Sequence, residues 1–131
     1  MSTHCGIAVK TEKGYEVIYC HHDGYPEYMW PMLTENYNSE ELAGKLLALG
    51  DASYIEKKLE PTYIDSETFH RFGTPEPNVC MFYHRDRGEP WEDVAPDVHQ
   101  TVKEALSQFY YGYLWENDCW HYVINGEEIY I

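Results

Sequence analysis

The chain begins with two short apolar runs that are separated by a polar segment. GIAVK (6–10) and YEVIYCH (15–21) are rich in β-branched and aromatic residues, and the TEKG segment between them ends in Gly14. Two such runs joined in this way are typical of a β-hairpin. Side chains alternate between the two faces of a strand, and neither face of the second run is purely polar. We therefore expect this strand to be covered, at least in part, on both sides.

The pattern then changes to one that predicts helices. A first helix is expected over 25–37, starting near Pro26, because proline is accommodated in the first helical turn. Pro31 lies beyond that turn and removes a backbone hydrogen bond, so we expect this helix to be kinked or broken. A second helix should begin after Ser39 and end at Gly50.

The second half of the chain mixes loops, one strand and one helix before it returns to strands. We expect a helical turn within 51–60, an irregular connection over 61–78, a strand at 79–84 and a helix over 96–109, whose apolar residues form one stripe. FYYGYLW, WHYVI and EEIYI then predict C-terminal strands, with a hairpin at the Asn-Gly pair 125–126.

Strands at both ends with helices between them predict one α+β domain over residues 1–131. We expect a mainly antiparallel sheet of five to six strands, covered on one face by two to three helices. The order of the elements favours two hairpin units that flank one central strand, and no repeat or change of composition marks a domain boundary.

The composition narrows the choice of partners. The chain has 23 acidic and 9 basic residues, a net charge of -14, which disfavours direct binding to nucleic acid or to anionic membranes. No apolar window is long enough to span a membrane, and the N-terminus lacks the pattern of a signal peptide, so a soluble cytoplasmic protein is expected. The charge itself has two explanations, solubility or attraction to a basic partner.

The four cysteines give no sign of a metal or redox motif. They are Cys5, Cys20, Cys80 and Cys119, which are far apart and form no CxxC pair. Three of the four lie in apolar stretches that predict strands. We expect free thiols in a reducing compartment.

The stretch YCHHDGYP (19–26) has two interpretations. It could supply a metal-dependent enzyme with ligands or a nucleophile from Cys20, His21, His22 and Asp23, but alternation along a strand divides these side chains between two faces. Further ligands would then have to come from His4, His84 or His121.

The other interpretation of this stretch is a structural junction between a strand and a helix. Asp23 and Gly24 form a strong turn pair, in which Gly24 can supply a positive φ and Asp23 can cap the helix that Pro26 starts. On this interpretation His22 and Tyr25 frame the junction, His21 belongs to it, and no chemistry is required. This interpretation explains more residues at once, so no metal or cofactor is expected.

Three segments together resemble an uncharacterised family of small phage and bacterial proteins with a Tyr-x-His-x-Asp-Gly-Tyr-Pro motif. They are IYCHHDGYPEYMWPMLTENYNSEELAGKLLALGDAS, FYHRDRGEPWED and YLWENDCWHYVING, and the matching positions are Tyr19, His21, Asp23, Gly24, Tyr25, Pro26, Gly50, Asp51, Arg85, Asp86 and Arg87. The family often has glycine where this chain has Trp30. The resemblance implies a phage or mobile-element origin and a setting in counter-defence, but no activity.

Charge and aromatic content lead to the main functional hypothesis, a non-enzymatic interaction protein. Aromatic residues crowd positions 108–124, where they could form either a core or a binding face. With the surrounding carboxylates they could block the basic, nucleic-acid-binding site of a host defence protein, as an anti-CRISPR or anti-restriction inhibitor would. The expected partner-binding residues are Glu35, Glu40, Glu41, Glu56, Glu89, Glu92, Asp93, Tyr110, Tyr113, Trp115, Glu116 and Asp118.

The alternative from a different class is a sponge for a cyclic nucleotide. Arg71, Arg85 or Arg87 would hold the phosphate of the nucleotide, and its base would stack on a tyrosine. These arginines could equally pair with nearby carboxylates inside the protein. No phosphate-binding or metalloprotease motif supports a conventional enzyme, and the sequence leaves the oligomeric state open.

Overall fold

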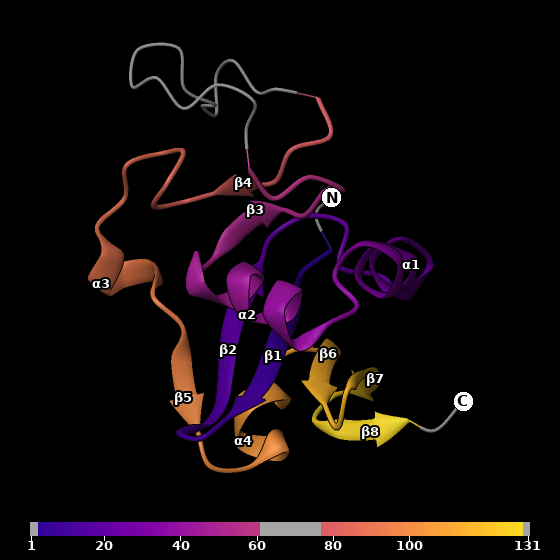
Figure 1. Ribbon diagram of the computed structural model, residues 1–131. Coiled ribbons are helices and arrows are strands. Elements are labelled where there is room, and N and C mark those ends of the chain that lie inside the picture. Colours follow the sequence, from indigo (N-terminus) through magenta and orange to yellow (C-terminus); the bar gives the residue numbers. More distant parts are fainter. Residues whose placement is uncertain (1–2, 61–76, 130–131) are drawn as a thin grey trace.

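The computed structural model describes residues 3–60 and 77–129 (Figure 1). The elements in chain order are β1 (Cys5–Thr11), β2 (Gly14–Cys20), α1 (Pro26–Asn36), α2 (Glu40–Ala48), β3 (Ala52–Tyr54), β4 (Met81–Phe82), α3 (Trp91–Val94), β5 (Asp97–His99), α4 (Val102–Leu106), β6 (Tyr111–Glu116), β7 (Cys119–Ile124) and β8 (Glu127–Ile129). Most of the expected connection over 61–78 lies outside the described residues.

The strands form one mixed sheet, and the α+β class is confirmed. Among the described residues the sheet has eight strands in the order β4-β3-β2-β1-β6-β7-β8, with β5 paired to β2 beside β3. Two of its pairings, β1 with β6 and β2 with β3, are parallel, and the others are antiparallel. The expected strand at 79–84 is β4, which lies at an edge and not at the centre. The centre is the parallel β1–β6 pair, which joins the N-terminal hairpin to the C-terminal strands.

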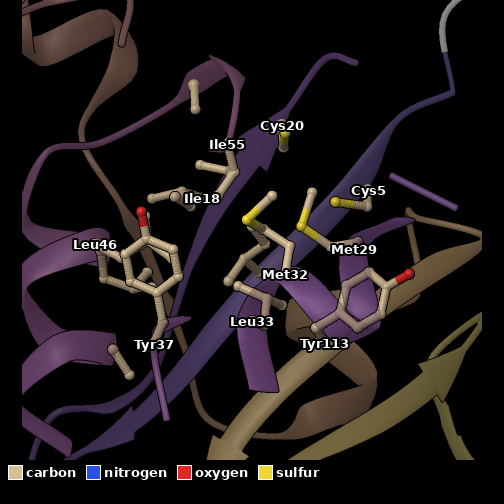
Figure 2. Packing of buried hydrophobic residues seen from close by; sticks show 14 of the residues in the cluster. Cys5, Ile18, Cys20, Met29, Met32, Leu33, Tyr37, Leu46, Ile55 and Tyr113 are labelled. Carbon is tan, nitrogen blue, oxygen red and sulfur yellow. The ribbon is translucent and has the colours of Figure 1, made fainter. Parts of the chain in front are cut away.

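Helices cover both faces of the sheet, so the expectation of helices on one face is wrong. On the first face, α1 and α2 contribute Met29, Met32, Leu33 and Leu46 to the larger core, where they pack near Ile18 and Tyr113 (Figure 2). On the second face, Ala105 and Leu106 of α4 cover a smaller core of Ala8, Val17, Leu114 and Val123. Coverage of β2 on both sides is confirmed.

Helix α1 runs without a break through Pro31. The expected break does not occur because Met29, Met32 and Leu33 are buried against the sheet, and this packing offsets the hydrogen bond that proline removes. Helix α2 starts where expected, since the Ser39 side chain accepts a hydrogen bond from the Leu42 N–H.

Two of the other helix predictions are wrong for a shared reason. Residues 52–54 form β3 and residues 97–99 form β5, because both segments pair with the outer edge of β2. Only the later part of the expected helix over 96–109 forms, as α4, which starts where the Thr101 side chain accepts from the Glu104 N–H. Strand pairing with a distant segment thus overrides the local helical pattern.

Tight turns connect the C-terminal strands. Asn125 and Gly126 both have positive φ, 51° and 85°, as do Asn117 and Asp118 between β6 and β7. Positive φ at both central residues matches the twist of a two-residue hairpin, which confirms the expected hairpin at 125–126.

The cysteines of the described chain are all free, and three of them, Cys5, Cys20 and Cys80, are buried. No helix within residues 3–60 and 77–129 is long and apolar enough to cross a membrane.

Candidate functional site: a groove at the edge of strand β2

The outer edge of β2 is shared by two strands, which leaves a gap between them. β5 pairs with β2 as far as Val17, and β3 pairs with it only at Cys20. In the gap, the Tyr19 N–H donates to the Asp51 Oδ1 at 2.9 Å. The Asp51 carboxylate therefore replaces the missing strand partner.

The backbone fixes Asp51 in this position. Gly50, at φ 81°, ends the α2 segment, and the Asp51 N–H donates to the Val94 carbonyl at 2.8 Å. The Asp51 carbonyl accepts from the Tyr83 N–H at 3.2 Å. Because the backbone is held on both sides, the carboxylate keeps its place beside β2.

An aromatic wall stands next to this carboxylate. Phe109, which follows α4, lies over Gly6 of β1, and a Cβ added to Gly6 would overlap the Phe109 ring. Gly6 is the strand partner of Tyr19, and the ring centroids of Tyr19 and Phe109 are 6.3 Å apart. The absence of a side chain at Gly6 therefore lets Phe109 lie beside Tyr19.

Two adjoining hollows flank Tyr19 and Phe109. One, of about 330 Å³, is lined also by Asp51 and Asp97, and the other, of about 320 Å³, is lined also by His4 and by two tyrosines that precede and begin β6. Together they form what we call the Tyr19 groove, whose lining residues are Thr3, His4, Val17, Ile18, Tyr19, Asp51, Asp97, Gln108, Phe109, Tyr110 and Tyr111.

Two histidines hold the Tyr19 phenol. The Tyr19 O–H donates to the His21 Nδ1, and the His4 Nδ1–H lies 3.0 Å from the Tyr19 Oη and donates to the His21 carbonyl at 2.9 Å. Burial, together with the nearby His22 and His4, lowers the pKa of His21. Burial also raises the pKa of Tyr19. The phenol therefore stays protonated near neutral pH, and the His21 ring adds no positive charge to the groove.

The electrostatics of the groove are set by its carboxylates. Burial, and then the charges of Asp97 and Glu89, raise the pKa of Asp51 from 3.8 to about 6, although its hydrogen bond from Tyr19 acts in the opposite direction. None of the lining residues is Lys or Arg, and within the described part of the chain no ion pair reaches Asp51 or Asp97. The groove thus combines unneutralised negative charge with aromatic surface.

Two of the residues that were expected to bind a partner are buried and cannot contact one. Tyr113 is fully buried and donates to the Gly24 carbonyl at 2.7 Å, and Trp115 is 4% exposed in the larger core. The prediction was wrong for these two because β6 is a central strand covered on both faces. Tyr110, by contrast, is 63% exposed and lines the groove.

The acidic residues expected at the binding surface lie on separate elements. They extend from α1 through α2 and α3 to the β6–β7 turn, and α1 and α3 lie on opposite sides of the molecule in Figure 1. Their positions are Glu35, Glu40, Glu41, Glu56, Glu89, Glu92, Asp93, Glu116 and Asp118, of which Glu56, Glu89 and Glu116 are half-buried and the rest exposed. The fold therefore spreads this charge over the body.

Two arginines of the nucleotide-binding alternative, Arg85 and Arg87, lie in the described part of the chain, and both contact other groups of the protein. The Arg85 guanidinium is mostly buried and donates to both Asp86 oxygens at 2.9 Å and to the carbonyls of Leu59 and Cys80. The Arg87 guanidinium lies over the Tyr83 ring, and Arg71 lies outside the described residues. Arg85 therefore serves an internal ion pair.

The cluster in YCHHDGYP divides as strand alternation predicts. Cys20 is buried on the face that α1 covers, near Cys5 (Figure 2), while His21 contacts Tyr19 on the groove side. Within residues 3–60 and 77–129, no three His, Cys, Asp or Glu side chains are placed to hold a metal ion. The metal-dependent alternative, which also involved His22 and Asp23, has no ligand set there.

The junction after β2 is built differently from the expectation. Asp23, at φ 57°, takes the positive φ that was expected at Gly24, and α1 begins after Tyr25 with no side-chain cap, so Asp23 does not cap it. Gly24 is needed for space instead, because an added Cβ would lie 2.6 Å from the Cys5 Cβ. Pro26 occupies the first helical turn as expected.

Most residues of the Tyr19 groove carry no signal in the sequence that would place them together. Tyr19, His21 and Asp51 are among the positions of the resemblance, but nothing in the sequence indicates that Asp51 lies beside Tyr19. Asp97, Gln108 and Phe109 carry no local signal at all, since only the topology brings them to β2. The one sequence feature that indicates the aromatic wall of the groove is the crowding of aromatic residues after position 107.

The fold and the groove together define an α+β protein with a mixed sheet, helices on both faces, and an acidic, aromatic-walled groove at the edge of β2. Comparison of the chain with protein-family models, with curated proteins and with solved structures found no match. Its function is therefore inferred from the geometry of the groove.

Proposed function

We propose that the protein is a non-enzymatic interaction protein that binds a basic surface of another protein through the Tyr19 groove. The observation that carries this proposal is the pair of carboxylates, Asp51 and Asp97, which line the groove without a Lys or Arg partner among the described residues. A basic side chain from a partner would supply the missing positive charge at a site with aromatic walls.

The spread of the other acidic residues suits a second role in the same function. With a net charge of -14, the whole body attracts a basic surface from any direction. Such long-range attraction raises the rate of association more than the final affinity. The exposed carboxylates on α1, α2 and α3 therefore guide the approach, while the groove makes the specific contact.

The kind of partner follows from the charge and from the resemblance to phage and bacterial proteins. An acidic surface competes with nucleic acid for the same Lys and Arg residues. If the chain derives from a phage or mobile element, a nucleic-acid-binding defence protein of the host is the expected target, and blocking its basic site is the expected effect, as in an anti-CRISPR or anti-restriction inhibitor.

The test is to capture partners from bacterial lysate at low salt, purify the retained basic protein, and measure its affinity for three forms of the chain. These are the wild type, the Asp51→Asn/Asp97→Asn variant, and a control, Glu12→Gln/Glu127→Gln, which removes two exposed charges outside the groove. We expect the groove variant to bind at least about tenfold more weakly, which corresponds to about 1.4 kcal/mol, and the control to bind as the wild type does.

Salt provides the second readout. The Debye length falls from about 10 Å at 0.1 M salt to about 3 Å at 1 M, so the affinity should fall steeply over that range. Retention of no basic protein, equal affinity at low and high salt, or a groove variant that binds as tightly as the wild type would contradict the proposal.

A further inference from the structure

We infer that the Tyr19 groove recognises one arginine side chain of its partner, with the guanidinium paired to Asp51 and Asp97 and lying against the rings of Tyr19 and Phe109. The inference rests on the proposed function and specifies what the groove binds. It follows from the arrangement of acceptors, from the aromatic walls and from the size of the hollow.

The acceptors in the hollow belong to two carboxylates, those of Asp51 and Asp97. The Asp51 Oδ1 already accepts from the Tyr19 N–H. Its Oδ2 and the Asp97 carboxylate accept no hydrogen bond from the described residues, so they are left for a ligand. A guanidinium has five N–H donors in a fixed planar fork, so it can pair with more than one carboxylate. An ammonium group concentrates its charge at one point, so it pairs less well with acceptor oxygens that belong to two carboxylates.

The aromatic walls of the hollow also favour a guanidinium over an ammonium group. The Tyr19 and Phe109 rings lie 6.3 Å apart at an interplanar angle of 30°, and both line the hollow that contains the carboxylates. The guanidinium stacks on aromatic faces and is more weakly hydrated than an ammonium, so it loses less on entering a partly closed site. Gln108 adds an amide at the same wall.

The size of the hollow fits a single side chain. Its volume of about 330 Å³ is at the lower end of the range for small-ligand sites, and the second hollow, beside His4 and Tyr110, leaves room for the backbone that carries the arginine. A phosphate or other anion is disfavoured, because the lining residues include two carboxylates and no Lys or Arg.

The test uses a minimal probe in place of a protein partner. The ¹⁵N-labelled chain is titrated with N-acetyl-arginine methylamide, and the backbone amide of Tyr19 is followed by NMR, since this N–H contacts Asp51 directly. We expect a saturable shift at Tyr19, Gln108 and Phe109. The lysine analogue should bind at least about threefold more weakly, and the uncharged citrulline analogue should cause no saturable shift.

Two variants keep the test independent of folding. Asp97→Asn removes an exposed carboxylate that makes no hydrogen bond within the described chain, so the fold is retained, and Asp51→Asn keeps an oxygen acceptor for the Tyr19 N–H. Each should weaken arginine binding at least about tenfold, while Glu12→Gln should leave it unchanged. Equal binding of arginine and lysine analogues, shifts confined to other surfaces, or unchanged binding by both variants would overturn the inference.

Failure here is distinguishable from failure of the proposed function. A chain that binds a basic partner in a salt-dependent way but shows no preference for the arginine probe would be an interaction protein without an arginine site. A chain that binds the probe but no basic protein would have the site without the proposed function.

Discussion

Replacing Asp51 by Asn should stabilise the protein at neutral pH and have almost no effect in acid. Burial and the charges of Asp97 and Glu89 raise the pKa of Asp51 from 3.8 to about 6, so the folded state binds the proton more tightly than the unfolded state does. The stability that this group contributes is therefore full below about pH 4 and is lost as the pH rises through about 6. Above that, the ionised carboxylate destabilises the fold.

The size of the expected change in unfolding free energy follows from the same pKa difference. Linkage makes this pKa difference worth about 3 kcal/mol for a fully desolvated group. Asp51 is only half-buried, so solvent screening reduces the effect to about 1–2 kcal/mol. Asn retains the acceptor for the Tyr19 N–H at 2.9 Å, so the substitution removes the charge and not the hydrogen bond. We expect the variant to exceed the wild type by about 1–2 kcal/mol at pH 7.5.

The assay is urea unfolding followed by the fluorescence of the buried Trp115 and Trp120, repeated between pH 4 and 7.5. Other groups titrate in this range, so the quantity of interest is the difference in unfolding free energy between variant and wild type. That difference should shrink toward zero at pH 4. A variant that is less stable at pH 7.5, or a difference that does not change with pH, would refute the reasoning. Asp97→Asn should give a smaller effect of the same sign, because it removes one of the charges that act on Asp51.

Three further substitutions test the core and the junction, all by urea unfolding at pH 7. Gly24→Ala should cost about 1–3 kcal/mol, because the new Cβ would meet the Cys5 Cβ at 2.6 Å. Tyr113→Phe should cost about 1–3 kcal/mol, since it leaves the buried Gly24 carbonyl without its 2.7 Å donor. Arg85→Gln should cost about 3–5 kcal/mol, because the fully buried side chain of Asp86 would lose its ion-pair partner.

Each of these has a control at an exposed position of the same residue type. Gly44→Ala, where an added Cβ meets nothing within 4 Å, should stabilise α2 by up to about 1 kcal/mol. Tyr110→Phe and Arg87→Gln should each change stability by less than about 0.5 kcal/mol. If a variant and its control lost the same stability, the proposed cause would be wrong for that pair. That cause is the close approach at Gly24, the buried hydroxyl of Tyr113 or the buried ion pair of Arg85.

The parts of the fold that depend on neighbouring residues could be predicted from the sequence. The hairpin at 125–126 and the start of α2 at Ser39 each depend on a turn or a cap a few residues long. Residues 52–54 and 97–99 could not be assigned in this way, because their strand state comes from pairing with β2 across long stretches of chain. Parallel pairing of β1 with β6, which buries Tyr113, is equally invisible to local patterns.

The same limit applies to the stretch YCHHDGYP and to the Tyr19 groove. That stretch gathers reactive side chains in sequence, but the strand separates Cys20 from His21, and the junction uses Asp23 and Gly24 for backbone conformation and close packing. The groove gathers Tyr19, Asp51 and Phe109 only in space. Chemistry that depends on a sheet edge becomes visible when the strand order is known.

Asp51 connects the stability of the fold to its proposed function. An Asn at this position would accept the same hydrogen bond from the Tyr19 N–H and would bridge the gap in the β2 edge without a charge. The fold therefore needs an acceptor there but not a carboxylate. The charge destabilises the protein at neutral pH because the carboxylate is partly buried and because Asp97 and Glu89 repel it. A group that lowers the stability of the fold, and that the fold does not require, is typical of a functional site. A bound cation would reverse the sign of that contribution, which is the role that the inferred arginine would fill.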